Sequence, residues 1–416
     1  MLTVEGALSR ILASVPAGSS ERVSLADSYG RVLAEPVDAP VNLPPWANSA
    51  MDGYAIRAAD LPGRLRVIET IAAGRAPTCR VEPGTAARIM TGAPVPAGAD
   101  AIVKVEDTQT FGDHVVIEVA ATVGQHIRTE GSDVRRGTRL LEPGKRISPG
   151  TAGLLASLGL ATVRVACRPR VAILSTGDEL VAPGGLLGPG QIYSSNNLAL
   201  VGLVIEAGGQ ALDHGTVADD PVQLRARFAA AAEGADLVVT TGGVSVGDFD
   251  HVKDVIGAGV EFWRVAMKPG KPLAFGQLLN KPFFGLPGNP VSCMVNFLEF
   301  VRPVIRTMLG DPRPFLPVVD AVLSRPVKRA PGRVELVRVR LEPHEEGLVA
   351  HPAGGHQGSG NVRSMADAHG FALFDAEMSE VSGAVRVQVF DWSFNDGSQP
   401  NYPWPPMRPH EAEGCC

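Results

Sequence analysis

Four short stretches in the middle of the chain combine glycines with hydroxyl, amide or charged side chains. Each of them follows a run of apolar residues that predicts a buried strand. They are Ser175–Leu180 (STGDEL), Thr241–Asp250 (TGGVSVGDFD), Met267–Pro272 (MKPGKP) and Gly285–Pro290 (GLPGNP). Glycine N–H groups bind phosphate oxygens, and carboxylates bind the divalent cation that accompanies phosphate. Together the stretches predict a site for a phosphorylated ligand and Mg²⁺.

The second of these stretches carries most of the candidate ligand-binding residues. They follow the strand predicted at Asp236–Thr241, and they are Gly242, Gly243, Ser245, Gly247, Asp248 and Asp250. A tight turn capped by an aspartate has the same composition, so this stretch alone favours neither interpretation. The three companion stretches favour the phosphate loop.

Lys268 and Lys271 stand beside two prolines that limit their freedom, which favours a bound polyanion over a solvated turn. Carboxylates and phosphate repel each other unless a cation lies between them, so Mg²⁺ is predicted. The chemistry expected is phosphoryl or nucleotidyl cleavage by positioning and charge stabilisation. Neither a Walker A motif nor a dinucleotide-binding fingerprint occurs in the right context, which excludes those ordinary nucleotide sites.

The surrounding pattern predicts a doubly wound, mainly parallel α/β domain, in which ligands bind beyond the carboxyl ends of the strands. Its expected strands are Val171–Ser175, Ala211–Val217, Asp236–Thr241, Glu261–Ala266, Leu273–Gln277 and Phe283–Leu286. Its expected helices are Asn197–Ala207, one from Pro221 to Glu233, a short one at Asp250–Ile256 and a long one at Pro290–Met308. Short strands separated by Gly/Pro-rich turns predict a small β domain on each side of it.

Composition excludes several classes of protein. A net charge of −6 and a pI near 5.9 argue against nucleic acid as a partner. No apolar run is long enough for a membrane span, and the N-terminus lacks the pattern of a signal peptide. The cysteines at 79, 167, 293, 415 and 416 form no C-x-x-C pair, so free thiols in the cytoplasm are expected.

The motifs together closely resemble the molybdopterin molybdenumtransferase family, the bacterial counterpart of the gephyrin E domain. Besides the four stretches above, the resemblance rests on NSAMDGYA (Asn48–Ala55), RIMTGAP (Arg88–Pro94), Gly124–Asp133 and GHQGSG (Gly355–Gly360). It implies insertion of molybdate into the dithiolene of adenylylated molybdopterin, with Mg²⁺ and release of AMP. The implied domains are an elongated dimerisation region (1–45 plus 132–168), an inserted β domain (46–131), the α/β domain (169–316) and a C-terminal β-barrel-like domain (317–394). The tail (395–416) has no counterpart in the family, and its composition predicts disorder.

The resemblance also implies a homodimer in which polar loops of one chain approach the α/β domain of the other. By motif match, the implied catalytic residues are Asp52, Thr91, Asp133, Glu179 and Asp250, of which Asp52, Glu179 and Asp250 would bind Mg²⁺. Asp219 or Asp220 is a further candidate acid. The implied substrate-binding residues are Arg128, Ser175, Thr176, Gly177, Gly242, Gly243, Ser245, Gly247, Asp248, Lys268, Lys271, Pro287, Asn289, Pro290 and Ser359. Asp248 stands where many relatives have Glu, and Thr129 and Glu130 stand where some have basic residues.

Two other functions fit part of the pattern. A molybdopterin adenylyltransferase shares the α/β domain and its TGG-x-S-x-G loop, but it has no place for NSAMDGYA or GHQGSG. A non-catalytic scaffold would keep the fold and lose the acids, all of which are present here. Molybdopterin adenylyltransferase and the apoproteins of molybdoenzymes are expected as candidate partners.

Overall fold

The chain forms two compact units in a computed structural model that describes residues 1–243, 255 and 259–395. Unit 1 comprises Met1–Ser19 and Ala166–Cys416, and unit 2 comprises Ser20–Val165. The helix predicted at Asp250–Ile256, apart from Val255, and the tail beyond Asn395 lie outside the described residues. The N-terminal segment is therefore divided, because α1 (Val4–Ala13) belongs to the same unit as the α/β region.

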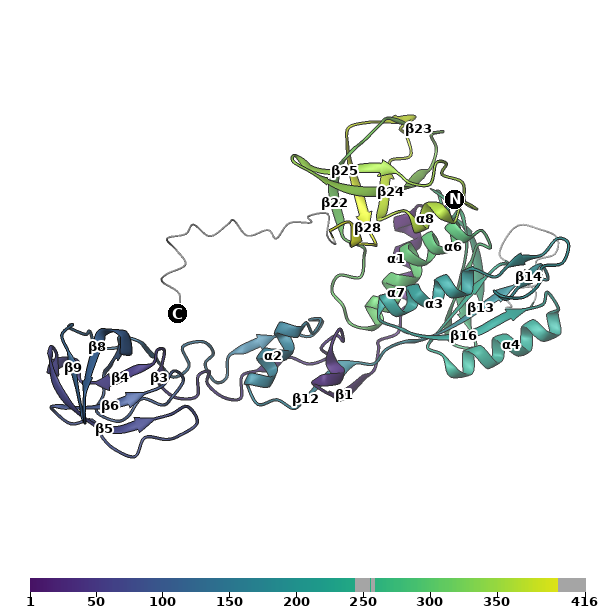
Figure 1. Ribbon diagram of the computed structural model, residues 1–416. Helices are drawn as coiled ribbons and strands as arrows, with labels where there is room; N and C mark the ends of the chain where they lie inside the picture. Colours follow the sequence, from purple (N-terminus) through teal and green to yellow (C-terminus); the bar gives the residue numbers. More distant parts are fainter. Residues whose placement is uncertain (244–254, 256–258, 396–416) are drawn as a thin grey trace. The chain divides into compact units, whose positions relative to one another are not determined.

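A six-stranded sheet at the centre of unit 1 confirms the predicted α/β fold (Figure 1). In spatial order its strands are β16 (Gln210–Val217), β13 (Arg170–Thr176), β17 (Leu237–Thr241), β21 (Lys281–Leu286), β20 (Pro272–Leu278) and β18 (Val260–Arg264). The first four are parallel, whereas β20 is antiparallel to both of its neighbours. Strand β18 therefore runs in the same direction as β21. The carboxyl ends of β13, β17, β21 and β18 lie along one edge.

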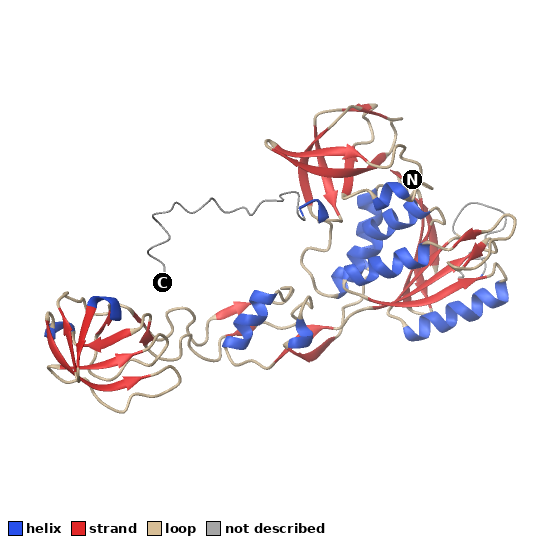
Figure 2. Ribbon diagram, in the orientation of Figure 1, coloured by secondary structure: helices blue, strands red, loops and turns tan. Residues whose placement is uncertain are grey.

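Helices cover both faces of this sheet (Figure 1, Figure 2). On one face α4 (Pro221–Gly234) buries Leu224 and Phe228, and the Phe228 ring packs edge-on against Phe283 with centroids 6.0 Å apart. On the other face lie α3 (Asn196–Ala207), α6 (Pro290–Asn296) and α7 (Arg302–Met308). Such two-sided cover explains why β13 and β17 are buried along their length without alternating polar residues. No helix among the described residues is long and apolar enough to cross a membrane.

Local signals set the helix ends largely as predicted. Asp220 caps α4 by accepting a hydrogen bond from Gln223 N at 2.8 Å, and α3 ends at Gly208 in the left-handed region. The predicted long helix from 290 to 308 is wrong in one respect, because a π-helical turn (η4, Phe297–Val301) separates α6 from α7. Pro303 lacks the N–H that an α-helix would direct at the Glu299 carbonyl, and the wider turn accommodates that loss.

The C-terminal part of unit 1 is a closed five-stranded barrel, which confirms the predicted β-barrel-like domain. Strand β24 pairs with both β25 and β26, and this closes the ring of β24 (Val334–His344), β25 (Gly347–Pro352), β22 (Val318–Leu323), β28 (Ala384–Val389) and β26 (Gly370–Phe374). The short β19 (Met267–Lys268) pairs in parallel with the start of β24. The MKPGKP stretch thus joins the barrel to the α/β domain. Two further short pieces are the β23–β27 pair (Val327–Lys328, Glu380–Val381) and α8 (Arg363–Ala366).

Unit 2 contains a second six-stranded sheet. Its order is β7 (Ala101–Lys104), β4 (Gly53–Ile56), β6 (Thr85–Ile89), β5 (Gly63–Ile71), β9 (His114–Ile117) and β8 (Thr108–Phe111). The sequence did not predict β8, whose residues are almost all exposed and carry little burial pattern. The rest of the unit consists of α2 and three pairs of short strands. Helix α2 (Pro149–Ser157) is capped by Ser148. The pairs are β1–β12 (Ser20–Ser24, Thr162–Ala166), β2–β11 (Val37–Asp38, Arg139–Leu141) and β3–β10 (Asn48–Ser49, Ile127–Arg128).

Candidate active site

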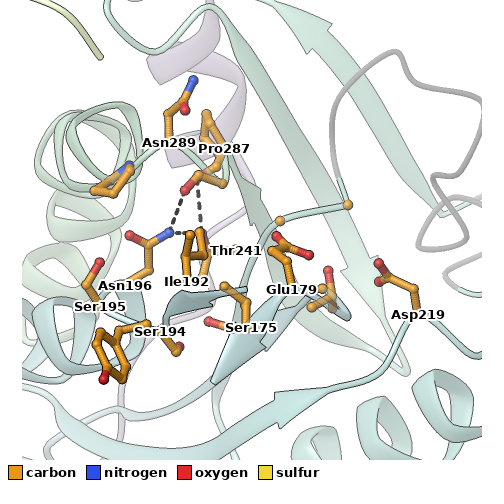
Figure 3. Close-up of a pocket in the computed structure, with 18 of the residues that line it drawn as sticks. Ser175, Glu179, Ile192, Ser194, Ser195, Asn196, Asp219, Thr241, Pro287 and Asn289 are labelled. Carbon is orange, nitrogen blue, oxygen red and sulfur yellow. Dashed lines mark hydrogen bonds between the residues drawn. The ribbon is translucent and has the colours of Figure 1, made fainter. Parts of the chain in front are cut away.

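A cavity of about 540 Å³ lies at the edge of the unit 1 sheet where the carboxyl ends of β13, β17 and β21 meet (Figure 3). Predicted site residues make up much of its lining, namely Ser175, Thr176, Gly177, Glu179, Asp219, Gly242, Gly243, Pro287, Asn289 and Pro290. They come from three separate loops and the start of α4. A cavity of this size, with polar groups from several strands, fits a nucleotide-sized ligand.

The sharp turn at Gly242 brings the phosphate-loop segment close to the neighbouring strand. Gly242 has φ +90°, and a Cβ built on it would lie 2.4 Å from the Thr176 carbonyl oxygen, so only glycine fits there. Its N–H donates to the Leu286 carbonyl at 3.2 Å and is therefore used within the fold. Gly243 also has a positive φ, of 63°. Ser245, Gly247, Asp248 and Asp250 lie outside the described residues.

A hydrogen-bond network fixes the floor of the cavity. Asn196, the first residue of α3, donates through Nδ2 to Thr241 Oγ1 at 2.9 Å and to the Gly288 carbonyl at 2.8 Å. Thr241 in turn donates to the Pro287 carbonyl at 3.0 Å. Figure 3 shows these bonds at the centre of the site. They tie the helix and two strands together, so the cavity is held in shape before a ligand binds.

Two buried hydroxyls of lining residues have no hydrogen-bond partner among the described residues. They are Thr176 Oγ1 and Ser194 Oγ. A buried polar atom without a partner costs free energy that a ligand group can recover by bonding to it. Ser175 differs, because its hydroxyl donates to Asn197 Oδ1, and Asn197 Nδ2 donates to Asp213 at 2.8 Å. Ser175 therefore orients α3, whereas the hydroxyls of Thr176 and Ser194 are buried without a partner among the described residues.

Glu179 and Asp219 are the acids that line the cavity among the described residues (Figure 3). The Glu179 carboxylate lies over Gly177, since a Cβ on that glycine would be 2.5 Å from Glu179 Oε2. Of the two candidate aspartates, Asp219 lines the cavity, whereas Asp220 caps α4. No group of three or more His, Cys, Asp or Glu side chains arranged for a metal occurs within the described residues. Glu179 and Asp219 nevertheless bring to the cavity two carboxylates, which are the side-chain ligands that Mg²⁺ prefers.

The lysines and the GHQGSG loop lie beside this cavity without lining it, as far as the described residues show. Lys268 Nζ forms an ion pair with Glu335 Oε1 at 2.9 Å, and the buried Glu335 carboxylate is also 3.2 Å from Arg329 Nε. Lys271 is half-buried and its carbonyl accepts from Val265 N at 2.8 Å. The Ser359 carbonyl accepts from Val291 N at 3.1 Å, which places the loop next to the start of α6.

Two of the predicted residues of unit 2, Asp52 and Thr91, lie together at one end of its six-stranded sheet. Asp52 precedes β4 and Thr91 follows β6, and the Asp52 carboxylate accepts two hydrogen bonds from Thr91. These bonds, with a smaller effect of the Arg88 charge, lower the pKa of Asp52. Arg128 lies in β10, opposite Asn48 of β3. Asp133 N donates to the Leu43 carbonyl at 2.9 Å, and its side chain is exposed.

One wall of the cavity was not predicted from the sequence, and it consists of Ile192, Tyr193, Ser194, Ser195 and Asn196. The expected helix at Asn197–Ala207 carried a usable signal, because two serines and an asparagine directly before a helix are typical of its amino end. That amino end lies at the same sheet edge as the predicted loops.

Three family models match consecutive parts of the chain. They are described as the MoeA N-terminal region (domain I and II) over residues 2–159, a probable molybdopterin binding domain over 172–307, and the MoeA C-terminal region (domain IV) over 320–391.

Proteins of similar sequence and structure span nearly the whole chain. Molybdopterin molybdenumtransferase 2 of Mycobacterium tuberculosis is 43% identical over 384 residues, which cover 89% of this chain and 94% of that protein. Molybdopterin molybdenumtransferase of Haemophilus influenzae is 37% identical over 398 residues, covering 94% and 98%. Two crystal structures of the molybdopterin biosynthesis MoeA protein of Pyrococcus horikoshii each have a TM-score of 0.81, with 33% and 27% identity; both cover 94% of this chain, and 99% and 100% of theirs.

Proposed function

The chain belongs to the molybdopterin molybdenumtransferase family, and we propose that it inserts molybdate into the dithiolene of adenylylated molybdopterin with release of AMP. The observation that carries this proposal is the cavity of about 540 Å³ at the carboxyl edge of the unit 1 sheet. Its lining residues include Glu179 and Asp219, and two of them have hydroxyls without a partner among the residues that the structure describes. Adenylyltransferase activity is not favoured, because the relatives align over all three matched regions and not over the α/β domain alone.

In this proposal the cavity binds the phosphate part of the substrate. The hydroxyls of Thr176 and Ser194 would donate to its oxygens, since neither has another partner among the described residues. Asn289, at the amino end of α6, and Gly243 add backbone polar groups to the lining of the same cavity. The residues beyond Gly243, including Ser245 and Gly247, are proposed from the motif match to complete the cradle.

Glu179 and Asp219 would hold Mg²⁺, together with Asp250, which is proposed from the motif match. Bound Mg²⁺ neutralises phosphate charge and makes the phosphate bond easier to break. Because the Glu179 carboxylate lies over Gly177, a larger residue at position 177 would displace it. The carboxylates thus favour a phosphate group that is bound to a divalent cation, and they repel a phosphate group without one.

We further propose that the enzyme is a homodimer in which Asp52 and Thr91 of a second copy complete the site, with Arg128 and Asp133. Support comes from Asp52, whose exposed carboxylate is held in one orientation by Thr91 and kept charged by its lowered pKa. An exposed, fixed carboxylate is suited to a ligand from outside its own unit. A cytoplasmic location is proposed on the free thiols of Cys79, Cys167 and Cys293.

The reaction is tested by incubating the purified chain with adenylylated molybdopterin, Mg²⁺ and molybdate. Release of AMP that depends on molybdate supports the proposal, and formation of adenylylated product from ATP and molybdopterin would instead identify an adenylyltransferase. The dimer is tested by mixing Asp52→Asn with Glu179→Gln chains. If the site is shared, mixed dimers carry one intact site, and about a quarter of the activity returns after equal mixing. If each chain has its own complete site, no activity returns.

A further inference from the structure

A second cavity, of about 360 Å³, adjoins the active-site cavity in unit 1. The two share Ser195, Asn196 and Pro290 in their linings, so they lie next to each other at the start of α3 and α6. We call the second one the side cavity. Its other lining residues are Ala199, Leu203, Glu206, Met294, Leu298, Val362, Met365, Ala366, Ala368, Phe390 and Asp391. They come from α3, the helical run after Asn289, the α8 region and the end of the barrel, which lie close together in Figure 1.

The walls of the side cavity are apolar, and its charged groups are both acidic. Leu203, Met294 and Met365 supply aliphatic and thioether surface from three different helices, and Phe390 supplies an aromatic ring. Glu206 and Asp391 are the charged lining residues among those described. Loss of solvent and the negative charge of Asp391 both raise the pKa of Glu206, so the carboxylates face a common space. The cavity thus fits a flat apolar body whose edge donates hydrogen bonds.

We propose that the side cavity binds the pterin ring of the substrate, with Glu206 and Asp391 accepting hydrogen bonds from its 2-amino and ring N–H groups. This proposal rests on the proposed function, in which the substrate carries a pterin. It adds a binding site to the active-site cavity and two acids that no motif match includes.

The chemistry of the ring edge distinguishes a pterin from an adenine. A pterin presents an N–H and an adjacent amino group, and these two donors match the two oxygens of one carboxylate as an arginine does. Adenine presents an amino group beside a ring nitrogen acceptor, whose lone pair a carboxylate repels. A phosphate is excluded because the charged groups of the lining are acids. Of these parts of the substrate, only the pterin matches the acids and the apolar walls.

The position of the side cavity next to the first cavity supports the same assignment. The substrate carries ring systems on both sides of its phosphates, so a phosphate bound in the active-site cavity needs an adjoining space for a ring. The side cavity is such a space, because Ser195, Asn196 and Pro290 line both cavities. Asn196 is fixed by its bonds to Thr241 and Gly288, so the wall that the two cavities share is held by the same network that shapes the site.

Binding of free pterin to the full chain tests the proposal, and quenching of pterin fluorescence measures it. Ala199→Phe places a ring inside the side cavity, and Glu206→Gln keeps the shape while removing the charge. We expect Ala199→Phe to abolish measurable binding and Glu206→Gln to raise Kd about tenfold, as for loss of one charge-assisted hydrogen bond. The matched controls are Leu198→Phe, on the same helix but exposed, and Glu233→Gln on α4; both should change Kd less than about twofold.

The binding readout separates this proposal from the proposed function. Absence of pterin binding to the wild-type chain, or equal binding by wild type and Ala199→Phe, would overturn the side-cavity assignment, whatever the rate of AMP release. Weaker binding of adenosine and unchanged binding of pterin in these variants would overturn it as well, and would assign the cavity to the adenine. Failure of wild type to release AMP would contradict the proposed function, and pterin binding would still decide the side cavity.

Discussion

Asp52 and Thr91 are 39 positions apart, yet Asp52 Oδ1 accepts hydrogen bonds from the Thr91 backbone N at 2.6 Å and from its hydroxyl at 2.7 Å. Strands β4 and β6 are antiparallel neighbours, so the residue before β4 and the loop after β6 lie at the same end of the sheet. Two motifs that are separate in the sequence thus form one polar unit.

Thr91→Val is expected to raise the pKa of Asp52 toward its usual value of 3.8, because it removes one donor to the charged carboxylate and leaves the backbone donor in place. A lowered folded-state pKa stabilises the fold above the unfolded pKa, and this contribution is lost as pH falls through the folded value. Carbon NMR of the Asp52 carboxyl during a pH titration measures the change. The control is Thr108→Val in the same sheet, and an equal Asp52 pKa in all three chains would contradict the expectation.

Gly242→Ala should destabilise unit 1 and reduce activity, because the new Cβ would meet the Thr176 carbonyl in a backbone conformation with φ +90°. Strain of this kind costs about 1–3 kcal/mol, before the displaced strand is counted. Gly288→Ala is the matched control in the same cavity, where the nearest atom to a Cβ is 3.7 Å away. Denaturant unfolding of both variants checks the difference, and equal stability would show that Gly242 is not sterically required.

Asp219→Asn and Asp220→Asn should separate catalysis from stability. Asp219 lines the cavity, so its variant should need more Mg²⁺ and lose activity about tenfold or more at fixed Mg²⁺. Asp220 caps α4, and replacing the cap with asparagine, itself a good cap, should change the free energy of unfolding by less than about 1 kcal/mol and leave activity unchanged. A Mg²⁺ titration of AMP release measures both variants. Equal Mg²⁺ dependence in the two would remove Asp219 from the metal site.

Glu299→Gln should flatten the pH dependence of stability. Burial raises the pKa of Glu299 to about 7 from a usual value of 4.5, since the charged form is poorly solvated in the buried turn η4, where Gln388 of β28 donates one hydrogen bond to it at 3.4 Å. Below pH 4.5 the side chain is neutral in both states, and between pH 4.5 and about 7 the native state keeps the proton more tightly. Stability from this group therefore falls as pH rises through that window, by about 3 kcal/mol.

The Glu299 prediction is checked by denaturant unfolding at several pH values between 5 and 8, with Glu233→Gln as the exposed control. Above pH 7 the Glu299→Gln variant should be more stable than wild type, because an uncharged amide avoids the cost of burying a carboxylate. If the free energy of unfolding depends on pH in the same way for wild type and Glu299→Gln, ionisation of Glu299 does not destabilise the fold.

The sequence predicted the α/β sheet, both β domains and most of the cavity. Buried parallel strands appear in the sequence as continuous apolar runs, and the loops that follow them meet at the carboxyl edge of the sheet. The wall from Ile192 to Asn196 was missed, since serines before a helix are typical of ordinary caps. The π-helical turn at Phe297–Val301 was not predicted either, because one wide turn hardly changes the spacing of apolar residues along a helix.

The placement of Lys268 was not predictable from its neighbours in the chain. Its partner Glu335 is 67 residues away and belongs to the barrel, and only the pairing of β19 with β24 brings the two side chains together. For a similar reason the sequence did not decide which of Asp219 and Asp220 caps the helix and which lines the cavity. Either of two adjacent aspartates before a proline can be the helix cap. Tertiary contacts, rather than local pattern, decide such cases.

The role of the cavity as the active site is tested most directly by the rate of molybdate-dependent AMP release by Glu179→Gln, measured beside wild type and Asp220→Asn. We expect Glu179→Gln, which keeps the shape of the side chain over Gly177, to lose at least about a hundredfold in rate and to unfold at the same denaturant concentration as wild type. Asp220→Asn should react at the wild-type rate. A Glu179→Gln chain that folds normally and releases AMP as fast as wild type would contradict the assignment of the cavity as the active site.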